Sequence, residues 1–200
     1  MNVIALLLII LAGIWGFVLI LTRKTAMFFK IVVFSVWCYL LAVLYRVLYA
    51  HFIPKPAFHA GYLSYAGTYF FLLSAYLSMN KQEKIEIKTS VKALAVTLST
   101  LVALWGIWNI YREYSLLSQL LLCPVVLTAY FACRFLFCSK DSNPAIVKLR
   151  VYNAVVLGLC MMQPIMLVVM LTRQHTFIPI LITSVLMVLL IPLAYRGCKE

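Results

Sequence analysis

Residues 3–24 read VIALLLIILAGIWGFVLILTRK, an apolar run that is closed by two basic residues. A helix needs about 20 apolar residues to cross the ~30 Å hydrocarbon core of a bilayer, and this run reaches that length before its first charge at Arg23. A helix on the surface of a soluble protein keeps one polar face, whereas this run is apolar on every side. The stretch therefore predicts a helix that spans a membrane.

Six further apolar stretches follow along the 200 residues, and 66% of the whole chain is hydrophobic. No connection between them exceeds 13 residues, which leaves no room for a soluble catalytic, nucleotide-binding or nucleic-acid-binding domain. We therefore predict an all-α, polytopic membrane protein whose residues 1–200 form a single domain, a bundle of seven transmembrane helices. The predicted spans are residues 3–22, 31–50, 62–79, 93–111, 116–138, 151–171 and 177–195.

The positive charges fall mainly in alternate connections. Thirteen of the 17 lysines and arginines lie on one side of the predicted bundle, three lie on the other, and Arg46 lies within a span. Because short cytoplasmic connections collect basic residues, the N-terminus is predicted outside and the C-terminus inside, in a plasma or inner membrane. No basic residue precedes the first span, so a retained anchor is expected rather than a cleaved signal. The thirteen are Arg23, Lys24, Lys30, Lys81, Lys84, Lys88, Lys92, Arg134, Lys140, Lys148, Arg150, Arg196 and Lys199.

The connection 80–92 reads NKQEKIEIKTSVK and carries Lys81, Lys84, Lys88 and Lys92 at helical spacing. A helical extension with this basic face favours anionic lipid headgroups, since each basic residue near the surface contributes about 1 kcal/mol. Docking of a cytoplasmic or membrane protein partner is the other interpretation. Nucleic acid is not an expected partner, because the basic residues of the chain are scattered over several short connections.

All six cysteines lie within spans or at their predicted cytoplasmic ends, so an extracellular disulfide is not expected. Cysteines inside a membrane behave mainly as small apolar residues. Cys138 and Cys198 are juxtamembrane and stand beside basic residues, which makes them candidates for palmitoylation.

Small residues four positions apart predict close helix packing, because lipid supplies no hydrophobic drive between helices. Ala12 and Gly16 show this spacing in the first span, and Ala154 and Gly158 show it in the sixth. We read these pairs as seams between helices of one bundle, with a dimer interface as the alternative.

Proline interrupts three spans, at Pro124, Pro164 and Pro192, and each proline frees a backbone carbonyl one turn earlier. Such carbonyls need partners from neighbouring helices or from water. Gln163 stands next to one of these kinks and could donate a hydrogen bond. The kinks are either ordinary features of membrane helices or, together with Gln163, the frame of a polar cavity.

Charged and aromatic residues gather at the predicted outer ends of the spans. We predict a small-ligand pocket there, in which Arg46 and Glu113 form an ion pair inside an aromatic mouth. The alternative is an aromatic belt, since such belts form at membrane interfaces in general. The candidate ligand-binding residues are Arg46, Tyr49, His51, Trp105, Trp108, Arg112, Glu113 and Gln163.

No aspartate or glutamate falls within a predicted span. Ion-coupled transporters usually rely on buried carboxylates, so coupled transport is disfavoured. The three histidines lie in outer connections without a carboxylate-rich partner set. We therefore predict no catalytic residue, no metal and no cofactor, and an enzyme is the less expected class.

Three functions are compatible with these features. The first is a sensor, receptor-like or partner-binding module with its ligand pocket at the outer face. The alternative is a facilitative carrier or channel with three plus one plus three helices, which the short echo of His51-Phe52-Ile53-Pro54 in residues 175–179 favours. A lipid-acting membrane enzyme ranks third. A carrier needs Gln119, Asn153 and Gln163 on a polar passage near the midplane, whereas a receptor needs a packed midplane and an outer pocket.

Overall fold

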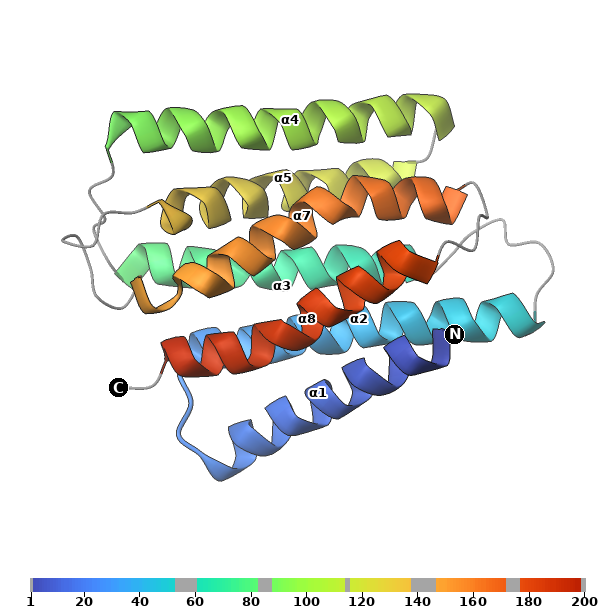
Figure 1. The fold of residues 1–200 in the computed structure, drawn as a ribbon, viewed down its shortest axis with the longest axis horizontal. Helices are drawn as coiled ribbons and strands as arrows, with labels where there is room; N and C mark the ends of the chain where they lie inside the picture. Colours follow the sequence, from blue (N-terminus) through green and yellow to red (C-terminus); the bar gives the residue numbers. More distant parts are fainter. Residues whose placement is uncertain are drawn as a thin grey trace.

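The computed structural model describes residues 2–52, 61–82, 88–113, 116–137, 147–171 and 177–198, and this part of the chain is helical throughout apart from short turns. Figure 1 shows the helices lying side by side, roughly parallel or antiparallel to one another. The helices are α1 (Asn2–Thr22), α2 (Met27–Phe52), α3 (Gly61–Gln82), α4 (Thr89–Glu113), α5 (Leu116–Leu136), α7 (Arg150–Leu171) and α8 (Phe177–Gly197). The prediction of an all-α fold is confirmed, and a helix lies at each predicted span, although α2 and α4 begin four residues before their predicted spans and α5 ends at Leu136.

Four of the described helices are long and apolar enough to cross a membrane. These four segments are Ile4–Thr22, Met27–Tyr45, Thr89–Trp108 and Ile178–Gly197. A shorter apolar segment lies in α5, at Leu122–Leu136. The length and composition of these helices are those of a membrane protein.

Five helices form a closed ring. Helix α2 packs on α3, α3 on α5, α5 on α7, α7 on α8, and α8 returns to α2. The two remaining helices lie outside this ring on opposite sides, α1 against α2 and α8, and α4 against α5 and α7 (Figure 1). Both outer helices expose large apolar side chains such as Leu11 and Leu104, as expected of helices that face lipid.

The order of neighbours is the same in the two halves of the chain. Helices α1, α2 and α3 pack in succession, as do α5, α7 and α8. Two seams join these triplets end to end, one between α3 and α5 and the other between α8 and α1. Helix α4, which connects the triplets in the sequence, packs only on members of the second among the helix pairs with substantial contact.

Gly16 sets the closest approach of α1 to the ring. A Cβ atom at this position would lie 2.9 Å from Val33 on α2 and 3.1 Å from Ile191 on α8, so the seam predicted at Ala12 and Gly16 is confirmed. The seam predicted at Ala154 is wrong, because that side chain is exposed. The interior face of α7 is occupied by its larger neighbours, which turns Ala154 outward.

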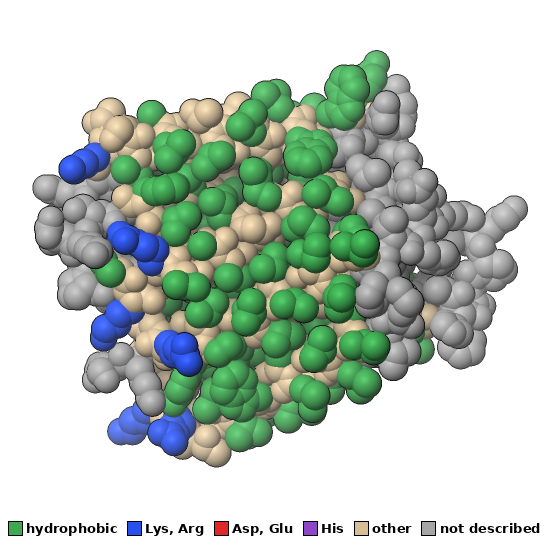
Figure 2. Space-filling view, in the orientation of Figure 1, with side chains coloured by type: hydrophobic (Ala, Val, Ile, Leu, Met, Phe, Trp, Pro, Cys, Tyr) green, Lys and Arg blue, Asp and Glu red, His purple; other side chains and the backbone are tan. Residues whose placement is uncertain are grey.

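Every lysine and arginine side chain that the structure describes lies at one end of the bundle (Figure 2). At this end α1, α3, α5 and α8 finish, and α2, α4 and α7 begin (Figure 1). The concentration of the described basic side chains at one end agrees with their occurrence in alternate connections along the sequence. These residues are Arg23, Lys24, Lys30, Lys88, Lys92, Arg134, Lys148, Arg150 and Arg196.

Candidate functional site

Two tyrosines of α3 reach across the interior of the ring to α7. Tyr69 and Tyr76 are seven residues apart, so they lie two turns apart on one face of the helix. Tyr69 is 2% exposed and Tyr76 is fully buried. Each hydroxyl bonds to a side-chain amide of α7, Tyr69 to Gln163 and Tyr76 to Asn153. We call these four residues the tyrosine–amide ladder.

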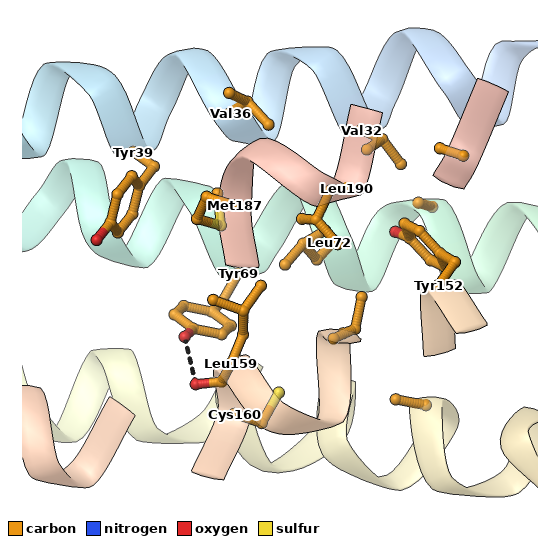
Figure 3. Close-up of a cluster of buried hydrophobic side chains, with 14 of the residues drawn as sticks. Val32, Val36, Tyr39, Tyr69, Leu72, Tyr152, Leu159, Cys160, Met187 and Leu190 are labelled. Carbon is orange, nitrogen blue, oxygen red and sulfur yellow. Dashed lines mark hydrogen bonds between the residues drawn. The ribbon is translucent and has the colours of Figure 1, made fainter. Parts of the chain in front are cut away.

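The upper rung of the ladder is the contact of Tyr69 with α7, at the turn that precedes Pro164. The Tyr69 hydroxyl lies 3.1 Å from the backbone carbonyl of Leu159 and 3.1 Å from Oε1 of Gln163 (Figure 3 shows the first contact). One hydroxyl proton cannot fully serve both acceptors. If the Gln163 amide turns over, its Nε2 donates to Tyr69 while Tyr69 donates to Leu159. In either orientation, either the oxygen or the nitrogen of the Gln163 amide remains without a hydrogen bond to the described residues.

The lower rung, between Tyr76 and Asn153, is a single short hydrogen bond. The Tyr76 hydroxyl donates to Oδ1 of Asn153 across 2.9 Å, and Asn153 is fully buried. The Tyr76 ring stacks on Phe135 at a centroid distance of 5.6 Å and on Phe131 at 6.3 Å, both from α5. These rings fix the direction in which the hydroxyl points. A second hydroxyl nearby, that of Tyr152, is buried and has no hydrogen-bond partner among the described residues.

Other helices of the ring complete the surroundings of the ladder. Thr128 on α5 directs its hydroxyl at the carbonyl of Tyr69, 3.4 Å away. Tyr39 on α2 meets Tyr65 on α3 edge to face, with their ring centroids 5.5 Å apart. Figure 3 shows Tyr39, Tyr69 and Tyr152 projecting into one interior together with apolar residues of α8.

The ladder holds amide donors without partners. Nδ2 of Asn153 and Nε2 of Gln163 are both buried and form no hydrogen bond with the described residues. A buried polar group left unpaired costs roughly 1–3 kcal/mol, and an apolar bundle gains nothing by keeping two of them. The ladder is therefore a set of neutral donors and acceptors that suits a neutral polar ligand.

The structure separates the residues of the predicted outer pocket. Trp105 and Trp108 lie on the outer surface of α4, where they are 45% and 62% exposed, whereas Gln163 is 2% exposed inside the ring. Of the remaining candidates, Arg46, Tyr49 and His51 belong to α2 and Arg112 and Glu113 to α4. The side chains of these five lie outside the described residues, so the Arg46–Glu113 pair stays a prediction.

The lysines of the predicted basic extension lie partly within the described chain. Lys88 is exposed just before α4, and its carbonyl accepts hydrogen bonds from Val91 and Lys92 in the first turn. Lys92 is exposed as well. The side chains of Lys81, Lys84 and Gln119, and all of Cys138, lie outside the described residues.

The sequence interpretation singled out Gln163 and Asn153 but missed Tyr69 and Tyr76. The signal available was the seven-residue spacing of Tyr62, Tyr69 and Tyr76 in a stretch that also holds other tyrosine, serine and threonine residues. That spacing shows that the tyrosines share a face, and it leaves open which helix they meet. The helix that these tyrosines meet is set by the three-dimensional arrangement, in which α3 and α7 face each other across the interior of the ring.

No family model, no curated protein and no solved structure matches this chain.

Proposed function

We propose that all seven helices cross a membrane, with the N-terminus outside and the C-terminus in the cytoplasm. The collection of described basic side chains at one end supports this orientation, because cytoplasmic ends carry the excess of lysine and arginine. Successive described helices alternate in direction, so that the first begins and the last ends at opposite ends of the bundle (Figure 1), as an odd number of crossings requires. In this arrangement the ladder lies in the interior of the bundle, with the rung at Tyr69 and Gln163 deeper and the rung at Tyr76 and Asn153 nearer the basic end, because Asn153 follows Arg150 by less than one turn.

We further propose that the protein is a facilitative carrier for a small, neutral, polar solute. The observation that supports it most is the tyrosine–amide ladder, in which Asn153 and Gln163 each keep one unpaired amide end inside a closed ring. Hydroxyls and amides can exchange hydrogen bonds with the hydroxyls of a polyol or sugar. No charged side chain is described in the ladder, which favours an uncharged solute and no coupling to ions.

The likeness of the two helix triplets supports a carrier as well. Advancing 124 positions along the sequence takes His51 to His175. The same step takes five buried residues of α2 to five buried residues of α7, and one of these pairs, Phe28 and Tyr152, meets edge to face at 5.3 Å. Repeated halves that rock against each other are a common basis of alternating access. The pairs are Phe28–Tyr152, Phe29–Asn153, Val32–Val156, Val36–Cys160 and Tyr39–Gln163.

The seam between α3 and α7 is the place where we expect the interior to open. On the opposite side of the ring α2 and α8 pack directly on each other. The connection between α3 and α7 instead includes the hydrogen bonds of the two rungs, which a solute can replace, and the contact between the Tyr76 and Tyr152 rings at 6.3 Å. Substituting one set of hydrogen bonds for another keeps the energetic cost of opening low.

A sensor that passes its signal to a partner is the second candidate. It is favoured by the packing of the interior, where the stacked rings of Tyr76, Phe131 and Phe135 fill the space beside the lower rung. A sensor would bind its ligand without moving it across the membrane. Transport by the purified protein alone separates the two functions.

The experiment is osmotic reswelling of proteoliposomes in glycerol, xylitol and glucose. We expect the protein to accelerate uptake of at least one of these solutes, and Gln163→Leu to reduce that acceleration at least tenfold. Thr97→Val is the matched control, because Thr97 is exposed and its hydroxyl bonds to Ala93 within its own helix. Uptake no faster than in empty vesicles, or equal rates for Gln163→Leu and the parent, would contradict the carrier.

A further inference from the structure

A pocket opens at the basic end of the bundle, and none of the four residues of the ladder lines it. Its volume is about 530 Å³, within the range of roughly 300–1,000 Å³ that small-molecule sites occupy. It lies where α1 ends, α2 begins and α8 ends. Figure 1 shows α1 diverging from α2 toward this end of the bundle. The residues that line it are Arg23, Lys24, Thr25, Ala26, Phe29, Tyr195 and Cys198.

The packing of α1 explains why the pocket exists. At Gly16 the helix lies against Val33 and Ile191 so closely that a Cβ would meet both side chains. Two turns further on, α1 ends at Thr22, and the chain turns through residues 23–26 before α2 begins. The helices touch at Gly16 and separate beyond it, so the turn with its two basic residues forms the rim of a wedge-shaped opening.

The chemistry of the lining changes with depth. Arg23 and Lys24 stand at the rim, and neither has an ion-pair partner among the residues that the structure describes. Thr25 Oγ1 is buried and forms no hydrogen bond with the described chain. Deeper in the bundle, the rings of Phe29 and Tyr195 meet edge to face at 5.6 Å and give an apolar wall.

We infer that this pocket binds the phosphate headgroup of an anionic phospholipid from the cytoplasmic leaflet. Arg23 and Lys24 supply two positive charges for the phosphate, and the Thr25 hydroxyl supplies a hydrogen bond. The start of α2 adds backbone N–H groups that have no partner within their helix. Phe29 and Tyr195 then receive the glycerol and the first methylenes of the acyl chains. Binding at this site does not depend on the proposed transport.

The test measures the thermal stability of the detergent-solubilised full-length protein while dioleoylphosphatidylglycerol is titrated against dioleoylphosphatidylcholine. We expect the anionic lipid to raise the Tm and the zwitterionic lipid to leave it unchanged. The double variant Arg23→Gln and Lys24→Gln should bind the anionic lipid about 20- to 30-fold more weakly, if each basic residue contributes about 1 kcal/mol. Thr25→Val should weaken binding about threefold without lowering the Tm of the lipid-free protein.

The matched control removes the same charge at the same end of the bundle. Lys148 and Arg150 lie at the beginning of α7 and do not line the pocket, so Lys148→Gln with Arg150→Gln should bind the anionic lipid as the parent does. An equal loss in this control would overturn the site, since it would mean attraction by net charge alone. Inorganic phosphate is titrated in a separate arm, and an equal Tm rise with it would overturn the assignment to a lipid.

Discussion

The hydroxyl of Tyr76 on α3 lies 2.9 Å from Oδ1 of Asn153 on α7, and this bond crosses the interior of the helical ring. Asn153 has no other hydrogen bond to its side chain among the described residues. Two helices on different sides of the ring are thus held in register by one phenol and one amide. This hydrogen bond therefore contributes both to the packing of the helices and to the candidate site.

Removing this hydroxyl should destabilise the protein. Tyr76→Phe keeps the ring stacked on Phe135 but leaves the whole amide of Asn153 unpaired, so we expect a loss of about 1–2 kcal/mol. Tyr152→Phe is the control, because the Tyr152 hydroxyl is buried without a described partner, and its removal should leave stability unchanged or raise it. Unfolding by SDS titration measures both. The prediction fails if the two variants are equally stable.

A methyl group at Gly16 should disturb the packing of α1. Gly16→Ala places a Cβ 2.9 Å from Val33 and 3.1 Å from Ile191, both β-branched side chains with little freedom, so we expect a loss of about 1–3 kcal/mol. Gly158→Ala is the matched change, since its Cβ would meet nothing nearer than Leu186 at 3.8 Å. Thermal unfolding in detergent should rank the Gly158 variant at or above the parent. A Gly16→Ala variant at least as stable as the Gly158→Ala variant would show that α1 is loosely packed at this position.

The thiol of Cys198 should react slowly at neutral pH. Burial raises its pKa, and this outweighs the lowering effect of a hydrogen bond with the backbone of Phe29. A raised pKa means less thiolate at a given pH, and the thiolate is the nucleophile. Labelling by N-ethylmaleimide should therefore be slower at pH 7.5 than at an exposed cysteine introduced by Lys88→Cys, and it should accelerate at a higher pH. Equal rates throughout the pH range would contradict this.

The proposed orientation predicts opposite labelling of the two ends of α4. Lys88 stands before the helix at the basic end, and Tyr111 is 70% exposed near the other end. With a membrane-impermeant maleimide, Lys88→Cys should react only in inside-out vesicles and Tyr111→Cys only in right-side-out vesicles. Reaction of both positions from one side would exclude a crossing by α4 and with it the seven-span topology.

The sequence predicted the helices well because their determinants are local. Apolar length sets where a span begins and ends, and the run before Arg23 or after Arg150 needs no knowledge of the rest of the chain. The seam at Gly16 was also predictable, since a small residue on a membrane helix usually marks a close approach.

The inward faces of the helices were harder to predict. In a soluble helix the polar side marks the surface, but a membrane helix is apolar on both its lipid face and its packed face. A polar side chain avoids lipid, so Asn153 could be expected to point inward, but an alanine fits either face and the exposure of Ala154 was not predictable. The pairing of Tyr69 with Gln163 depends on the ring of helices, which is a property of the whole chain.

Helix α4 links the two triplets in the sequence while its substantial packing contacts are with the second triplet alone. The chain between Gln82 and Lys88 is therefore the covalent joint between two bodies that otherwise meet through side chains. A protein divided at this joint keeps each described helix whole and each contact between the described helices available. Residues 1–85 and 86–200, produced as separate polypeptides in one membrane, should consequently associate and restore the Tyr76–Asn153 bond.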